Sequence, residues 1–270
     1  MKLGKKLLVT GFALAISGGA QAINVDGDWT DWITPGAGAA SDWTPNDGAV
    51  KYDVNDQTGG SGAYLNPGYG GQAYDAEAIY VKVSGSAIHV AVITGRDPNA
   101  TGWRWGDIAL DFGNDGSFEY GMIARSDAGQ HSSSGIGLAG EVYQVDAWNV
   151  GIWDAPSDHS PNPTTDYANE HPTSVMTGTK LGEGEFAFSA MTGDVGALGG
   201  QHWFMEALIP VGFLDESLLS QPFTAHWTMG CANDWIQVDP LIAAVPEPVS
   251  LSLFGLGLLG LFRGRRKQLN

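Results

Sequence analysis

The chain has 270 residues and a formal net charge of −17, from 30 acidic and 13 basic side chains. Seven of the basic residues lie among the first six or the last eight positions, so the interior is strongly acidic. This charge repels nucleic acid and anionic membrane surfaces, and we exclude nucleic acid as a partner. Ten tryptophans and 39 glycines argue against a disordered chain and favour many short strands joined by turns.

The N-terminus has the three parts of a secretory signal. Three lysines within the first six residues precede an apolar run at 7–16 and small residues at Ala20 and Ala22. We therefore predict a signal helix within 1–22 that signal peptidase removes after Ala22. A retained membrane anchor is the alternative, and the apolar run is too short for it.

The C-terminus also divides into three parts. A Pro-Glu-Pro segment precedes an uncharged run at 249–262, and a basic end follows at 263–267. A helix of that apolar length rises about 21 Å, which is less than the roughly 30 Å of a hydrocarbon core. We predict a short transmembrane helix whose basic end stays cytoplasmic while the body lies outside. The predicted sorting residues at the two ends of the chain are Ala20, Ala22, Pro246, Glu247, Pro248, Arg263, Arg265 and Arg266.

This tail, over 241–270, resembles the PEP-CTERM sorting signal of Gram-negative bacteria that make exopolysaccharide. The order of the Pro-Glu-Pro segment, the short apolar span and the arginine-rich end carries the resemblance. It implies export across the inner membrane and transient anchoring through 249–262. It also implies processing by exosortase, a membrane enzyme, with delivery to the cell surface or the extracellular space. An ordinary tail anchor with a chance Pro-Glu-Pro is the alternative.

Alternating apolar residues predict that much of the body forms strands. Two hairpins are expected at 79–93 and 108–122, each around a turn that contains glycine. Further elements are expected as strands at 142–150, 185–188, 203–209, 225–230 and 235–238, and as one or two helical turns at 211–219. Residues 34–76 and 154–179 are rich in turn-forming residues and are predicted to be irregular. The pattern predicts an all-β fold, a single antiparallel, jelly-roll-like β-sandwich over 23–240.

Three short segments of the body resemble family-nine carbohydrate-binding modules and their DOMON-like relatives. They are the opening at 25–32 (Val-Asp-Gly-Asp-Trp-Thr-Asp-Trp), the strand at 204–210 with Glu206 before Ile-Pro, and the closing strand at 223–234. The resemblance implies a β-sandwich in which aromatic side chains stack on sugar rings and calcium ions brace loops. The long segment at 34–76 and the aromatic residues at 94–106 depart from the family pattern.

Oxygen-bearing side chains gather around the turn of the second hairpin. They are Asp111, Asn114, Asp115 and Glu119. Ca²⁺ takes six to eight oxygen ligands, so these residues are candidate calcium ligands, although their spacing is not that of an EF-hand. Two interpretations stay open: the group binds calcium, or Asn-Asp-Gly simply makes a good turn and the flanking acids face water.

The loop before this hairpin carries Trp103, Arg104 and Trp105 between two glycines. Exposed indole faces stack on sugar rings, and an arginine bonds hydroxyl or acidic groups, so the three residues are a candidate glycan-binding site. The alternative is that one or both rings pack over the end of the sandwich as part of its core.

No catalytic constellation stands out. The single cysteine, Cys231, cannot form an internal disulfide and is expected to be buried and inert. The histidines lack the spacing of a zinc site, and His202 and His226 are expected to be polar residues on the face of a sheet. We therefore predict that the protein is not an enzyme but an exported glycan-binding or structural component of the exopolysaccharide matrix. A secreted enzyme that acts on exopolysaccharide is the alternative, because two catalytic acids can hide among many carboxylates.

Overall fold

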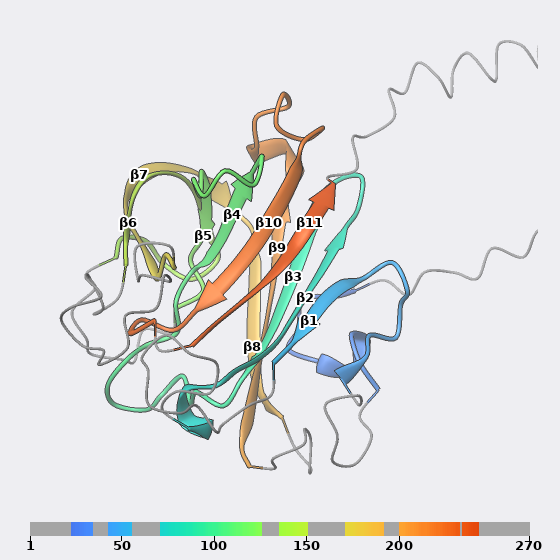
Figure 1. Ribbon diagram of the computed structural model, residues 1–270, viewed down its shortest axis with the longest axis vertical. Helices are drawn as coiled ribbons and strands as arrows, with labels where there is room; N and C mark the ends of the chain where they lie inside the picture. The colour runs from blue at the N-terminus through green and yellow to red at the C-terminus, as the bar shows by residue number, and fades with distance from the viewer. Residues whose placement is uncertain are drawn as a thin grey trace, which may run out of the picture.

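The computed structural model describes residues 23–34, 43–55, 71–125, 135–150, 171–191, 200–232 and 234–242. In this part of the chain the fold is all-β, with two antiparallel sheets that form a sandwich (Figure 1), which confirms the predicted fold class. The strands are β1 (Lys51–Val54), β2 (Ala76–Val83), β3 (Ala87–Thr94), β4 (Ile108–Phe112), β5 (Tyr120–Met122), β6 (Glu141–Asn149), β7 (Ser174–Glu183), β8 (Glu185–Met191), β9 (His202–Pro210), β10 (Pro222–Thr228) and β11 (Trp235–Ile242). Short 3-10 helices are η1 (Trp29–Asp31), η3 (Gln72–Tyr74) and η5 (Val211–Phe213).

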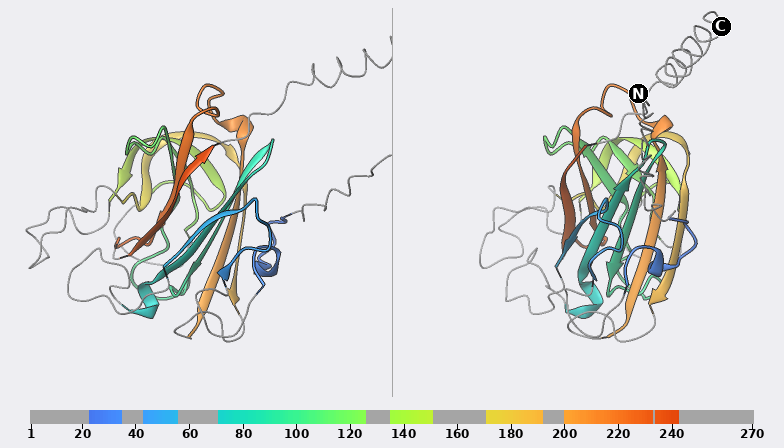
Figure 2. Two further views of the ribbon diagram at one scale, coloured as in Figure 1. Left: turned by 45° about the vertical axis from the view of Figure 1, so that its right-hand side comes forward. Right: turned by 90° about the vertical axis from the view of Figure 1, so that its right-hand side faces the viewer.

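The two sheets differ in size and in connection. The first sheet has the order β1-β2-β3-β9-β8, and the second has the order β11-β10-β4-β5-β6-β7. The right-hand view of Figure 2 shows β10 and β11 on one side of the molecule and β8 and β9 on the other. The chain therefore crosses between the layers after β3, β7 and β9. Among the described residues most pairings join consecutive strands, and two pairings, β3 with β9 and β4 with β10, join strands that are distant in sequence.

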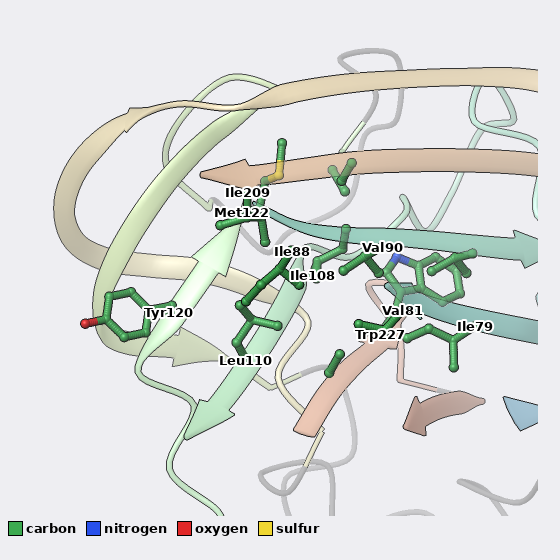
Figure 3. Packing of buried hydrophobic residues seen from close by; sticks show 14 of the residues in the cluster. Ile79, Val81, Ile88, Val90, Ile108, Leu110, Tyr120, Met122, Ile209 and Trp227 are labelled. Atoms are coloured by element: carbon green, nitrogen blue, oxygen red, sulfur yellow. The ribbon is translucent and has the colours of Figure 1, made fainter. Parts of the chain in front are cut away.

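The main core fills the space between the sheets. Alternate residues of β2 and β3, such as Val81 and its partner Val90, point to the same face because side chains alternate along a strand. Leu110 of β4 and Trp227 of β10 meet them from the second sheet (Figure 3). The indole nitrogen of Trp227 donates to the Gly106 carbonyl at 3.1 Å, so the large ring is buried without an unpaired donor.

The outer face of the first sheet is also buried. Trp32, Ile33 and Trp43, which precede β1, pack against Tyr80 and Phe204 on that face. Apolar residues are therefore needed on both sides of β2, β3 and β9, which is why these strands are buried along most of their length. The N-terminal segment folds back onto this face through Trp32, which is 1% exposed.

Two predictions of irregular structure are wrong in part. β7 begins at Ser174, inside the predicted loop 154–179, and β1 lies inside the predicted excursion 34–76. β7 is an edge strand with many exposed positions, and its pairing with β6 contains several register shifts. Its sequence consequently shows little alternation of apolar and polar residues.

The predicted signal helix and the predicted tail helix fall outside the described residues. Within the described ranges, none of the helices has the length and apolar character that a membrane span requires. β11 continues to Ile242, two residues past the expected end of the domain at 240.

Candidate functional site

The turn between β4 and β5 is closed by the carboxylate of Asp111. Its two oxygens accept hydrogen bonds from the backbone amides of Asp115 at 3.2 Å and Gly116 at 2.8 Å. The chain reverses here through positive φ angles at Gly113 (104°) and Asn114 (54°). Glycine and asparagine tolerate this conformation better than other residues, so the sequence specifies the turn locally.

The turn brings three carboxylates together. One oxygen each from Asp111, Asp115 and Glu119 lies within 4.8 Å of the other two. Asp111 is buried, Glu119 is half-buried and Asp115 is exposed, so the group opens to solvent on one side. Asp115 also accepts a hydrogen bond from the Ser117 amide at 2.9 Å, and Glu119 accepts one from the Phe112 amide at 2.9 Å.

The electrostatics of this cluster favour a cation. Burial raises the pKa of Glu119, the negative charges of Asp111 and Asp115 raise it further, and the bond from the Phe112 amide opposes the rise. A hard divalent cation between the three oxygens would remove this repulsion, and water or carbonyl oxygens would complete its shell. Chemically, the three carboxylate oxygens are ligands of the type that Ca²⁺ takes.

Asn114 makes a separate contact. Its side-chain oxygen lies 3.1 Å from the hydroxyl oxygen of Thr224 on β10, and a carboxylate oxygen of Asp239 on β11 is the second acceptor within reach of that hydroxyl. The structure therefore brings together three of the four predicted ligands, and it links the fourth to the neighbouring strands.

The three residues of the candidate glycan-binding loop have different environments. Trp105 is 1% exposed, its indole nitrogen donates to the Arg96 carbonyl at 2.8 Å, and its ring packs edge-to-face on Phe188. It belongs to the core and offers no face to a ligand, as the alternative interpretation expects. Trp103 and Arg104 are half-buried.

Arg96 holds this loop in place. Its guanidinium donates to the carbonyls of Trp103 at 2.7 Å and Thr101 at 3.0 Å, and it lies 4.9 Å from the centre of the Tyr74 ring. A second contact joins the loop to the segment that follows β10, because the Arg104 carbonyl accepts a hydrogen bond from the Gly230 amide at 2.8 Å. The loop is thus a fixed platform at the end of the sandwich.

A group of stacked aromatic rings on the second sheet was not expected from the sequence. His171 and His226 approach each other with 3.4 Å between Nδ1 and Nε2, and the indole of Trp235 stacks on His171 at 4.5 Å. Burial lowers the pKa of His171 to about 4 and that of His226 well below its ordinary value, with the charge of His171 adding to the second shift. Both imidazoles are therefore neutral at neutral pH. His171 lies in the predicted loop, so no periodic signal pointed to the pair.

Glu206 on β9 holds the opening segment at 25–32 through three hydrogen bonds. Its oxygens accept bonds from the backbone amides of Asp26 at 2.8 Å and Gly27 at 2.5 Å, and from the indole nitrogen of Trp32 at 3.0 Å. Burial raises the pKa of Glu206, while these three bonds lower it. The residue anchors the N-terminal segment to β9 and has no free oxygen for chemistry.

Cys231 is buried, as predicted. His202 is also buried; its Nε2 lies 3.3 Å from Glu77 and 3.1 Å from the amide nitrogen of Gln72. Within the described ranges, these contacts make His202 part of a polar interior rather than of an exposed site. The remaining information on function comes from the tail.

A PEP-CTERM protein-sorting motif matches residues 244–267. The PEP-CTERM match covers the Pro-Glu-Pro segment at 246–248, the apolar run and the basic end, so the resemblance of the tail is confirmed. The motif implies export, processing by an exosortase-type enzyme, and a location at the cell surface or outside the cell. The predicted sorting residues at 20 and 22 and from 246 to 266 lie outside the described part of the chain. A search of curated proteins finds no match to this chain.

Proposed function

We propose that this PEP-CTERM protein is a non-catalytic component of the exopolysaccharide matrix, which it binds or helps to structure at the cell surface of a Gram-negative bacterium. The observation that carries the proposal is the sorting motif at 244–267 on an acidic β-sandwich. In this proposal signal peptidase removes 1–22, and an exosortase-type enzyme then acts on the tail. The likeness of the body to family-nine carbohydrate-binding modules supports sugar as the ligand.

Trp103 and Arg104 are the proposed contacts to the glycan. Both are half-buried, and Arg96 fixes the loop that carries them, so little conformational freedom is lost on binding. Trp105 supports the loop from inside the core. Calcium at Asp111, Asp115 and Glu119 is proposed to brace the opposite end of β4.

The test uses the exported protein purified from its host, incubated with the exopolysaccharide of the same cells. We expect retention on the polymer without a fall in polymer length, and Trp103→Ala should weaken retention about tenfold, since stacking on a ring is worth roughly 1–1.5 kcal/mol. Tyr52→Ala is the matched control, because Tyr52 is an exposed aromatic residue on β1 and lies outside the loop that carries Trp103. Shortening of the polymer would instead support an enzyme, and equal retention of all three proteins would refute the loop as the binding site.

A further inference from the structure

The end of β11 shows which end of the sandwich lies next to the sorting tail. Ile242, the last residue of β11, pairs with Pro222 at the start of β10, and the Pro222 carbonyl accepts a bond from the Gly113 amide at 2.8 Å. The acidic turn at 113–117 therefore lies two strands from the exit, roughly 10 Å away. The arrowheads of β4 and β11 point to the same end of the sandwich in Figure 1.

Two more turns belong to this end. Residues 84–86 connect β2 and β3, and the Ser86 carbonyl accepts a bond from the Val211 amide at 2.9 Å, which brings in the segment at 214–221 before β10. We call the surface formed by 84–86, 113–117 and 214–221 the exit end. It contains Asp115, Asp215 and Glu216, all exposed, and no lysine or arginine.

The opposite end carries the loop with Trp103 and Arg104. β3 begins at the exit end and finishes at Thr94, and β4 starts from the far end at Ile108, so residues 95–107 lie one strand length away. An eight-residue strand such as β3 spans about 26 Å.

The connection to the tail is short compared with that length. Pro246 follows Ile242 by four residues, which reach at most about 14 Å when fully extended. The sandwich cannot turn over on such a connection while the tail is in the bilayer, because its far end would have to pass through the membrane surface. Like charge between the acidic body and anionic lipid also opposes a sandwich that lies flat.

We propose that the exit end faces the membrane while the tail is inserted, and that the loop at 95–105 is presented outward to the matrix. This inference rests on the proposed function, in which the tail enters the bilayer before processing.

The experiment places a fluorophore at either end of the full chain. Ser117→Cys and Asn99→Cys each introduce an exposed thiol, and the wild-type protein, whose Cys231 is buried, reports background labelling. The labelled proteins are reconstituted into vesicles of phosphatidylethanolamine and phosphatidylglycerol that contain a quencher on the lipid headgroup. We expect the label at 117 to lose most of its emission and the label at 99 to keep most of its emission.

A linker variant tests the role of the short connection. Twenty Gly/Ser residues inserted after Ile242 span about 25 Å, so emission from the label at 117 should recover. Proteins that float with the vesicles but show equal or reversed quenching at 117 and 99 would overturn the proposed orientation alone. Proteins that fail to float with the vesicles would overturn both the membrane-inserted tail and the orientation that depends on it.

Discussion

Acid should destabilise this fold through the buried histidine pair. His171 and His226 are packed against each other and against the Trp235 ring, and Nε2 of His171 and Nδ1 of His226 have no hydrogen-bond partner among the described residues. A proton added to either ring creates a buried charge that no described carboxylate neutralises. Folding therefore favours the neutral rings, which is why the pKa of His171 falls to about 4.

The size of the effect follows from proton linkage. The unfolded chain takes up the proton near pH 6.5, and the folded chain takes it up near pH 4, so the unfolded state binds more protons between these values. Stability from His171 is complete above pH 6.5 and is lost as the pH falls toward 4. Between pH 7 and pH 5 this single group costs about 2 kcal/mol, and His226, whose pKa is also lowered, acts in the same direction.

Urea unfolding of the wild type and of His171→Gln at pH 7 and pH 5 measures this loss. We expect the variant to lose about 2 kcal/mol less than the wild type between the two pH values. Trp235→Phe is the control, since it weakens the same stack while keeping both imidazoles, and its loss with pH should equal that of the wild type. An equal loss in the wild type and in His171→Gln would refute the reasoning.

Three further predictions concern the anchor, the metal cluster and a close packing contact. Glu206→Ala should lower the free energy of unfolding by about 3–5 kcal/mol in urea, because three donors lose a charged acceptor; a loss below about 1 kcal/mol would contradict the anchor. Calcium at about a hundred times its dissociation constant should add about 2.7 kcal/mol to the stability of the wild type in calorimetry and nothing to that of Asp115→Asn. Glu216→Gln, which changes an exposed acid outside the cluster, should respond like the wild type. Equal responses of all three proteins would refute the calcium site. Gly121→Ala would place a methyl carbon 2.6 Å from the Trp148 ring and should cost about 1–3 kcal/mol, whereas Gly85→Ala meets nothing within 4 Å and should be nearly neutral; similar melting points for both variants would show that Trp148 moves freely.

Local signals were sufficient to predict much of the sheet. The hairpin of β2 and β3 alternates clearly around Ser84-Gly85-Ser86, and the turn at 113–116 is specified by residues that accept positive φ. The cluster of Asp111, Asp115 and Glu119 could be predicted for the same reason, because both arms of one hairpin carry it. The sorting tail is read entirely from the order of its residues.

Non-local partners decided the rest. β7 is strand because β6 pairs with it, and its own residues alternate too weakly to show this. The burial of Trp105 depends on Arg96 in the same loop and on Phe188, which β8 brings from a distant part of the sequence. His171 meets His226 across 55 positions of sequence, and no periodic pattern records such a contact.

The amino-acid sequence alone determined the sorting motif of this protein, its acidity and the alternation of apolar and polar residues that makes it a β-protein. These properties are carried by neighbouring residues, so they can be read in order along the chain. Only the tertiary structure decided which aromatic residues are core and which carboxylate anchors the N-terminal segment. It also decided which end of the sandwich the tail leaves, because each of these depends on strands that the chain brings together from distant positions.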